Sequence, residues 1–306
     1  GVKKQLFFWA LNLGLRYEMN GANGPWYEFQ LKLANKLIFN KWRDALGGNI
    51  LAVVSGGAAL QSRLARVFWA AGMPVLEGYG LTETSPVIAV NGLNAGAAKF
   101  TTVGKAIRDV EIKIAEDGEI LCKGPNVMKG YYNRPDLSDE VIDKDGFFHT
   151  GDIGELVDGQ YLRITDRKKE IFKTAGGKYI APQILENKFK ESPYIEQMIV
   201  IGENERFPAA LILPNFPALA AWCSRSNIPF SNNADMVKDQ RVIDKIQSVI
   251  DHFNKDFGHW EQVKKFELLT EDWSIDGGEL TPKLSLKRKV ILQKYKDQVE
   301  KIYKNA

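Results

Sequence analysis

The sequence predicts an α/β region, then an antiparallel β region, and finally a small α+β domain. Three observations support this fold class. Residues 50–80 run strand, glycine loop, helix, strand, which is typical of a parallel α/β unit. The pairs Asp117-Gly118 and Asp158-Gly159 each separate two alternating apolar runs, the strongest local signal for a β-hairpin. After Asp166 helical and strand patterns mix again, so we place a domain boundary between Thr165 and Asp166.

The elements before residue 80 follow from apolar spacing. Residues 1–46 have the periodicity of amphipathic helices. One broad apolar face is expected to hold Phe29, Leu31, Leu33, Leu37 and Ile38. A short apolar run at residues 50–54 predicts a strand that ends in a glycine pair. A helix carrying Leu64 and Val67 follows, and residues 74–78 predict a second strand.

The remaining elements follow from turn and capping signals. Residues 100–165 are expected to form antiparallel strands. A short helix should begin near Pro182, because proline suits the first turn of a helix. Two strands are expected at 197–203 and 208–215, an amphipathic helix at 233–257, a strand at 264–271 and a basic terminal helix at 287–304.

Composition excludes several classes of function. The 306 residues suffice for about two domains. The 41 basic residues nearly balance the 38 acidic ones, so the net charge of +3 gives no support for nucleic-acid binding. Cys122 and Cys223 have no CxxC spacing, which predicts two free buried thiols in a reducing compartment, the cytoplasm. The three histidines form no ligand-spaced cluster, and the longest apolar run near the start, residues 6–15, is shorter than a membrane span.

The stretch "EGYGLTETSP", residues 77–86, combines the groups that a nucleotide needs. The Tyr79 ring can stack on a flat base, and Gly78 and Gly80 allow a backbone to approach closely. Glu83 can hold a hard cation such as Mg²⁺. The hydroxyl groups that can donate to phosphate oxygens belong to Thr82, Thr84 and Ser85. The alternative is a hydroxyl-rich turn that caps a helix.

Three later stretches have the same dual interpretation. Asp152, in Thr-Gly-Asp, can accept two hydrogen bonds from a ribose diol or can simply belong to a turn. Arg167 begins a run of cations that ends at Lys178 and suits phosphate recognition, although most charge runs are solvated surface. A third set of cations, which could neutralise phosphate or form a surface patch, comprises Lys283, Lys287, Arg288 and Lys289.

Together these motifs resemble the adenylate-forming superfamily of acyl-CoA synthetases, luciferases and peptide-synthetase adenylation domains. The resemblance is strongest to long-chain fatty acyl-CoA synthetases, and it covers residues 50–290. The matching motifs, in family order, are "SGGAAL", "YGLTETSP", "TVGKAIRDVEIKI", "GFFHTGDIGEL", "DRKKEIFKTAGGKYIAPQILE" and "LTPKLSLKRKVI". The resemblance implies that residues 1–165 are the C-terminal part of a large AMP-binding domain and residues 166–306 a small mobile domain.

The resemblance also implies roles for individual residues. Tyr79 would stack on the adenine, Glu83 would bind Mg²⁺, and Asp166 would be the hinge. Residues placed against ATP or AMP are Gly56, Gly57, Ala58, Glu77, Gly78, Tyr79, Gly80, Thr82, Asp152 and Arg167. Residues placed near coenzyme A, for the thioester step, are Lys173, Gly176, Gly177 and Lys178. Lys287 would be the active lysine, with Lys283 as the alternative, because Leu286 stands where the family has glycine.

The implied reaction joins a fatty acid to coenzyme A at the expense of ATP. The fatty carboxylate attacks the α-phosphate, and Mg²⁺ and a lysine offset the repulsion between the two anions. The thiol of coenzyme A then displaces AMP from the acyl-adenylate. No side-chain nucleophile is required, so a missing Ser-His-Asp set is expected. Peripheral contact with the inner face of the membrane is also expected, because the substrates are lipids.

One family motif is missing from the sequence. The Ser/Thr/Gly-rich phosphate loop that ends in Pro-Lys-Gly does not occur upstream of residue 50. We therefore expect a portion of a synthetase that does not form acyl-AMP alone, with an exposed apolar face where the lacking half would pack. One alternative is a non-catalytic module that binds AMP or acyl-CoA. A second is that the basic terminal helix contacts a membrane or nucleic acid, against which the small net charge argues.

Overall fold

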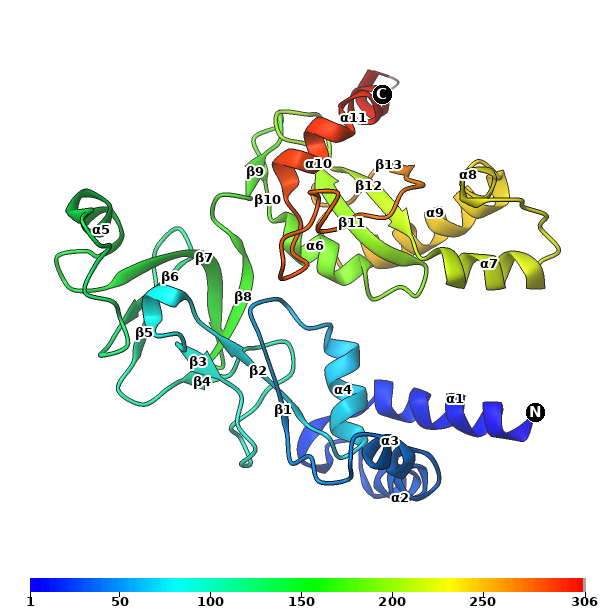
Figure 1. The fold of residues 1–306 in the computed structure, drawn as a ribbon, viewed down its shortest axis with the longest axis horizontal. Helices are drawn as coiled ribbons and strands as arrows, with labels where there is room; N and C mark the ends of the chain where they lie inside the picture. Colours follow the sequence, from blue (N-terminus) through cyan, green and yellow to red (C-terminus); the bar gives the residue numbers. More distant parts are fainter. Residues whose placement is uncertain (305–306) are drawn as a thin grey trace. The chain divides into compact units, whose positions relative to one another are not determined.

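The computed structural model describes residues 1–304, and the chain folds as two compact units, Gly1–Thr165 and Asp166–Ala306. Figure 1 shows the order of elements in each unit. The division falls at the pair of residues where the sequence pattern changes.

Unit 1 begins with helices, as the periodicity predicted. They are α1 (Val2–Leu15), α2 (Pro25–Ala34), a π-helical turn (Asn35–Phe39), α3 (Asn40–Ala45) and, after the first strand, α4 (Ser62–Ala70). Helix α1 packs against both α2 and α4. Their shared core is apolar and includes Leu13, Leu31, Phe39 and Met73. A short 3₁₀ turn, Met19–Gly21, joins α1 to α2.

Two four-stranded sheets complete unit 1. The first has the order β1 (Val53–Gly56), β2 (Val75–Tyr79), β3 (Ala89–Val90) and β4 (Lys105–Ala106), and β1 runs parallel to β2 as predicted. The second contains β5 (Glu111–Ile114), β6 (Glu119–Lys123), β7 (Phe148–Val157) and β8 (Tyr161–Arg167). The hairpins at Asp117-Gly118 and Asp158-Gly159 are confirmed.

Two expectations for unit 1 need correction. The first strand begins at Val53 rather than at residue 50, because it starts where pairing with Val75 begins. The region 100–165 is not purely β, since it holds the short helix α5 (Pro135–Val141), which has proline in its first turn. Both cysteines are free and buried, as expected.

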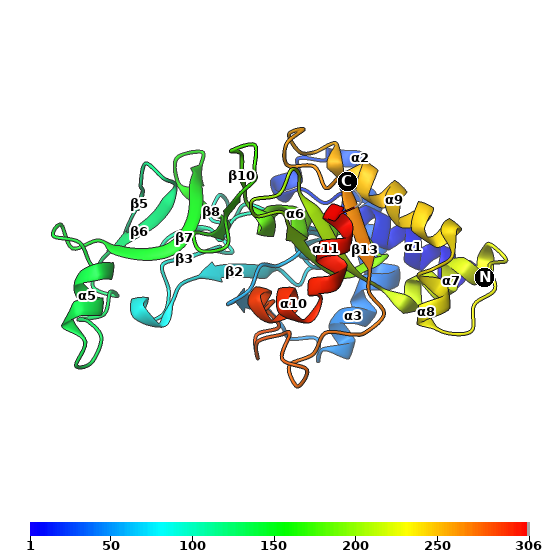
Figure 2. The ribbon, with the colours of Figure 1, turned by 90° about the horizontal axis from the view of Figure 1, so that it is seen from above.

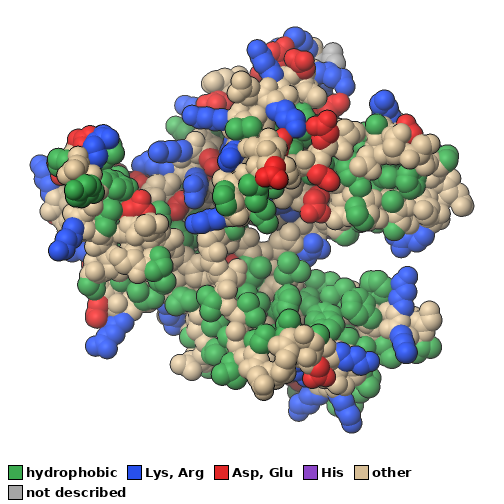
Figure 3. Space-filling view, in the orientation of Figure 1, with side chains coloured by type: hydrophobic (Ala, Val, Ile, Leu, Met, Phe, Trp, Pro, Cys, Tyr) green, Lys and Arg blue, Asp and Glu red, His purple; other side chains and the backbone are tan. Residues whose placement is uncertain are grey.

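The predicted exposed apolar face of unit 1 is confirmed. Several large apolar side chains of the first helices and of β1 face solvent, including Phe8, Trp26, Phe29 and Val54. Trp26 is 71% exposed and Val54 is 72% exposed. Figure 3 shows hydrophobic side chains gathered over this helical region. Strand β1 is also an edge strand, so its outer backbone groups have no strand partner within the described residues 1–304.

Unit 2 is an α+β domain built on a mixed three-stranded sheet. The sheet has the order β11 (Ile195–Ile201), β12 (Ala209–Pro214) and β13 (Lys265–Leu268), with β12 antiparallel to β11 and parallel to β13. Every residue of the central strand β12 is buried. Figure 2 shows the sheet among its helices, of which α6 (Pro182–Phe189) contacts β11.

The other elements of unit 2 match the predicted order with two breaks. They are β9 (Phe172–Lys173), β10 (Tyr179–Ile180), α7 (Phe216–Arg225), α8 (Asn233–Met236), α9 (Gln240–Asn254), α10 (Arg288–Lys294) and α11 (Lys296–Lys304). The single helix expected at 233–257 is wrong, because Asp239 caps a new helix by accepting the Arg241 N–H at 2.9 Å. The terminal helix likewise breaks at Tyr295. Helix α7 and the short strands β9 and β10 were not anticipated.

Candidate nucleotide and lysine sites

The parallel pair β1–β2 gathers most of the predicted nucleotide residues of unit 1. Gly56 lies opposite Gly78, and Ser55 lies opposite Glu77. Parallel strands end at the same edge of a sheet, so the loops after Gly56 and Tyr79 leave it side by side. The predicted residues that share this edge are Gly56, Gly57, Ala58, Glu77, Gly78, Tyr79 and Gly80.

A hydrogen bond joins this edge to the second sheet. The Tyr79 hydroxyl donates to Asp152 Oδ2 at 2.7 Å, although 73 residues separate them. Asp152 lies on β7 and is only 8% exposed. Burial, and then the nearby Asp152 carboxylate, raise the pKa of Tyr79 above its ordinary value, so the hydroxyl stays protonated and remains a donor. The structure thus brings together two residues that sequence motifs had predicted separately.

Glu77 connects strand β2 to the loop that follows β1. Burial raises the pKa of its carboxyl to about 7, and a hydrogen bond from the Leu60 backbone acts in the opposite direction. Leu60 lies in the loop after β1, so this bond ties that loop to β2. The Glu77 carboxyl therefore holds a proton to higher pH than an exposed glutamate does, and in its protonated form it can donate a hydrogen bond as well as accept one.

The 3₁₀ turn Thr82–Thr84 presents the predicted cation ligand. Glu83 Oε1 accepts a hydrogen bond from the Tyr131 hydroxyl at 3.0 Å, and its backbone carbonyl accepts one from the Met128 N–H at 2.8 Å. The Thr82 side chain is exposed beside it. No cluster of three or more acidic, histidine or cysteine side chains in residues 1–304 could hold a metal ion. One carboxylate still fits Mg²⁺, which usually takes one or two carboxylates together with substrate phosphates.

The expectation for Thr84 is wrong. Thr84 is fully buried, and its Oγ1 donates to the Pro86 carbonyl at 2.9 Å and accepts the Leu81 N–H at 3.0 Å. It therefore closes the loop and does not face a phosphate. Gly80 serves the same loop: a Cβ there would lie 1.6 Å from the Pro86 carbonyl oxygen. The absence of a side chain at Gly80 therefore makes room for the Pro86 carbonyl of the same loop, and not for a ligand.

Asp152 has supporting neighbours that sequence reasoning missed. Glu119, buried on β6, accepts the Gly151 N–H at 2.9 Å through Oε1. Its Oε2 lies 3.1 Å from His149 Nδ1, and His149 Nε2 lies 3.6 Å from Asp143 Oδ2. An acidic residue directly after an Asp-Gly turn looks like a solvated position, so the sequence carried no signal for this role.

Asp166, the predicted hinge, is a buried capping residue in unit 2. Its Oδ1 accepts the Arg167 N–H at 2.6 Å, and its Oδ2 accepts the Gln183 N–H at 2.9 Å in the first turn of α6. Burial raises the pKa of Asp166 to about 7 despite these two bonds, and the Glu186 and Glu170 carboxylates add a smaller upward contribution. The Arg167 side chain is exposed next to it.

The residues predicted for the coenzyme A step lie on a small hairpin. Strands β9 and β10 pair with Lys173 opposite Tyr179, and Gly177 takes the turn with φ +79°. The Lys173 Nζ lies 5.4 Å from the Tyr179 ring centroid. The structure therefore brings together four exposed residues on one loop, namely Lys173, Gly176, Gly177 and Lys178.

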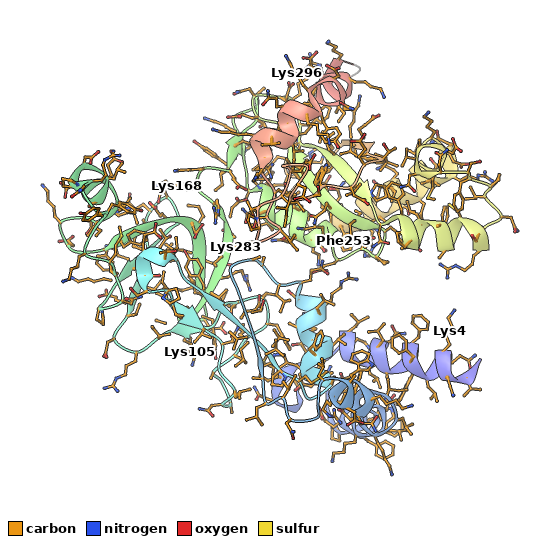
Figure 4. All side chains as sticks on the ribbon, in the orientation of Figure 1. Lys4, Lys105, Lys168, Phe253, Lys283 and Lys296 are labelled. Carbon is orange, nitrogen blue, oxygen red and sulfur yellow. The ribbon has the colours of Figure 1, made fainter. Side chains whose placement is uncertain are left out.

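The two candidate active lysines occupy different places on one loop. Leu280 and Leu286 form an isolated antiparallel bridge, and the Leu284 N–H donates to the Thr281 carbonyl at 2.8 Å. Lys283 is therefore at the tip of the loop, and Figure 4 labels it there, ahead of α10. Lys287 is at the base, directly before α10, and its N–H donates to the Glu279 carbonyl at 2.7 Å. Both side chains are exposed.

Comparison with known proteins identifies the class. The AMP-binding enzyme profile matches residues 20–132, and the profile of the AMP-binding enzyme C-terminal domain matches residues 169–306. The chain therefore belongs to the AMP-binding enzyme family, which confirms the resemblance inferred from the motifs. Among residues 1–304, none of the helices is long and apolar enough to span a membrane.

Individual relatives are long-chain-fatty-acid–CoA ligases by name. The chain is 40% identical over 270 residues to FadD15 of Mycobacterium bovis, a match that covers 88% of this chain and 44% of the relative. It is 35% identical over 285 residues to human long-chain-fatty-acid–CoA ligase 1, covering 89% of this chain and 40% of the relative. The chain thus spans less than half the length of these two relatives.

Solved structures share the fold. The adenylation domain of carboxylic acid reductase from Segniliparus rugosus, solved with AMP and a carboxylic acid, matches 98% of this chain and 46% of that chain, with a TM-score of 0.69 and 21% identity. The adenylation domain of the carboxylate reductase from Mycobacterium chelonae gives the same TM-score. The predicted fold, part of an acyl-CoA synthetase-like large domain followed by a small α+β domain, agrees with these neighbours.

Proposed function

We propose that this chain forms the adenosine-binding edge and the C-terminal domain of a long-chain fatty acid–CoA ligase. The observation that carries the proposal is the 40% identity to a ligase of that name across 88% of the chain. The arrangement of Tyr79, Asp152 and Glu83 gives it chemical support. The substrates are ATP, a fatty acid and coenzyme A.

The residues of unit 1 suit the nucleotide. The Tyr79 ring stacks on adenine, and its hydroxyl holds Asp152, which accepts the ribose hydroxyls. Thr82, exposed on the 3₁₀ turn, donates to phosphate oxygen. Glu83, oriented by Tyr131, is the carboxylate that this chain offers to Mg²⁺. When bound, Mg²⁺ neutralises phosphate charge and so eases the attack of one anion on another.

The residues of unit 2 suit the two half-reactions. Arg167, at the start of unit 2, binds a ribose hydroxyl. Lys287 supplies positive charge to the phosphoryl group during acyl-AMP formation. The exposed loop around Gly177 and Lys178 serves the thioester step with coenzyme A. Asp166 is the residue about which unit 2 turns between the two steps.

The chain does not complete this reaction by itself in our account. It lacks the phosphate loop that grips the outer phosphates of ATP, and FadD15 of Mycobacterium bovis is more than twice as long as its matched segment. The exposed apolar residues of α1, α2 and β1 mark where the complementary half packs.

Titration with AMP tests the nucleotide site in the chain as it stands. We expect weak AMP binding by calorimetry and no palmitate-dependent AMP release. Asp152→Asn should weaken AMP binding at least about tenfold, because a charge-assisted pair of hydrogen bonds is lost. Asp158→Asn, in an exposed turn, is the matched control. Equal AMP binding by both variants contradicts the assignment of Asp152 to the ribose. A chain fused to the complementary half that binds AMP but shows no turnover supports the alternative, a non-catalytic module.

A further inference from the structure

The loop that carries the two candidate lysines is held at both ends by buried charged residues. We call these ends, Glu279 and Arg288, the base of the loop. Residues 280–287 leave the body of unit 2 after Glu279 and return to it at Arg288, the first residue of α10. The tip at Lys283 is exposed, whereas the two flanking residues Glu279 and Arg288 are largely buried. The base is therefore where the structure determines the position of Lys287.

Arg288 is tied to two other elements of unit 2. Its Nη1 donates to Glu186 Oε1 on α6 at 2.5 Å, and its Nη2 donates to the Val200 carbonyl on β11. The same Glu186 Oε1 accepts the Val200 N–H at 2.7 Å. The side chains of Arg288 and Glu186 are only 13% and 5% exposed. One guanidinium thus links α6, β11 and the start of α10.

A second buried carboxylate holds the other end of the base. Glu279 is 1% exposed, and its Oε1 accepts a hydrogen bond from Lys294 Nζ at 2.8 Å. Its backbone carbonyl accepts the Lys287 N–H at 2.7 Å. Lys287 is therefore held on both sides, by Glu279 through its own backbone and by Arg288 through the next peptide bond.

Net stability does not explain why charges occupy these positions. A buried ion pair is often no more stabilising than apolar side chains of the same volume, because desolvation of both charges opposes their attraction. Directional hydrogen bonds do fix geometry, and a bidentate arginine fixes it best. The core of unit 2 is otherwise apolar around β11 and β12, so an ion pair there points to a positioning role.

We propose that Glu186 and Arg288 are positioning residues, which set the place of Lys287 for acyl-adenylate formation. The proposal rests on the proposed function for the role of Lys287, but the fixing of the loop base is independent of it. Neither residue touches substrate. Their loss should impair adenylation and leave the thioester step, which uses the separate loop around Gly177, nearly unchanged.

The first experiment measures amide hydrogen exchange in the chain of 306 residues. A single substitution leaves a buried charge unpaired and can unfold the domain, so the informative variant is Glu186→Leu/Arg288→Met, which removes both charges. We expect exchange at residues 281–288 to rise at least about tenfold while β12 stays protected.

Two further variants calibrate this result. Arg288→Lys, which keeps the pair with Glu186 but loses the bond to Val200, should give an intermediate rise. Arg241→Met, which removes an exposed ion pair with Asp239, is the control.

The second experiment separates the half-reactions in a fusion of this chain to the part of FadD15 from Mycobacterium bovis that lies outside the matched 44%. The double variant should lose at least about tenfold in kcat for palmitate-dependent pyrophosphate release, with KM for ATP little changed. Acyl-CoA formation from supplied palmitoyl-AMP should keep its rate. Unchanged exchange at residues 281–288, or equal losses in both half-reactions, overturns the proposal. A wild-type fusion that releases no pyrophosphate refutes the proposed function instead, and the exchange result then still decides whether the ion pair fixes the loop.

Discussion

At the scale of single residues, the bond from Tyr79 to Asp152 is the most informative contact in the structure. It joins the end of β2 to β7 and orients the carboxylate that we assign to the ribose. Glu77 and Asp166 share a second property: burial raises the pKa of each carboxyl to about 7. These groups therefore change charge in the physiological range.

Removal of the Tyr79 hydroxyl should destabilise the chain. Tyr79→Phe leaves the buried Asp152 carboxylate without this donor, which should lower the free energy of unfolding by about 1–3 kcal/mol. Urea unfolding checks the prediction. Tyr132→Phe is the control, because Tyr132 is 92% exposed. Equal stability of both variants contradicts a structural role for the Tyr79–Asp152 bond.

Glu77 should make stability depend on pH. The pKa of Glu77 is about 7 in the folded chain and 4.5 in the unfolded chain. Between these two pH values the folded chain therefore keeps a proton that the unfolded chain has already released. Stability from this group is present at low pH and is lost as pH rises through 7, by no more than about 3 kcal/mol.

Glu77→Gln should flatten that fall, as thermal unfolding at pH 5 and pH 8 will show. Part of the slope remains in the variant, because burial also raises the pKa of Asp166 and of Glu186, which gives contributions of the same sign. The exposed Glu116→Gln serves as control. A variant that falls with pH as steeply as wild type shows that Glu77 does not titrate in this range.

At the scale of elements, loop geometry decides which residues can meet a ligand. The turn after β2 is closed by Thr84 and by the approach of Pro86 to Gly80, so the residues left to meet a ligand are the exposed Thr82 and Ser85 and the half-buried Glu83. The hairpin around Gly177 is open by comparison. At Gly176 the nearest atom to a built Cβ is Thr174 Oγ1 at 4.0 Å.

Alanine at these two glycines should have opposite consequences for folding. Gly80→Ala forces a Cβ onto the Pro86 carbonyl and should cost more than about 3 kcal/mol. Gly176→Ala meets no clash and should change stability by no more than about 1 kcal/mol. Chemical denaturation of both variants provides the comparison. Tolerance of Gly80→Ala means that the loop adopts another path.

The sequence predicted elements better than it predicted partners. Asp-Gly turns and Pro182 act locally, so the hairpins and the start of α6 could be read directly. The break at Asp239 was missed because an aspartate within a helical pattern caps or continues a helix depending on packing. The bonds Tyr79–Asp152 and Glu186–Arg288 span 73 and 102 residues and have no local signal. Thr84 was misjudged for a different reason: its partners Leu81 and Pro86 lie within three residues, but a threonine in a polar turn can equally bond its own loop or face a ligand.

At the scale of the whole molecule, the apolar surface of unit 1 sets its behaviour in solution. Trp26 and Val54 are both more than 70% exposed, and the unpaired edge of β1 lies in the same region of the chain. Such surfaces are covered in stable proteins or lead to association.

The isolated chain should therefore self-associate. We expect sedimentation velocity to show concentration-dependent assembly from the micromolar range upward, with binding of the apolar dye ANS. Trp26→Lys/Val54→Lys should reduce both, whereas Tyr132→Lys, at an exposed aromatic residue elsewhere, should not. A monomer without dye binding at about 100 μM contradicts the idea that this face needs a cover.

The most direct test of the account is palmitate-dependent AMP formation in the presence of coenzyme A. It should be measured for this chain alone and for a fusion to the portion of FadD15 from Mycobacterium bovis that lies outside the matched 44%. We predict no turnover by the chain alone, and AMP and palmitoyl-CoA in equal amounts from the fusion, lost on Lys287→Ala. Turnover by the chain alone, or a correctly folded fusion that binds AMP without turnover, contradicts the account.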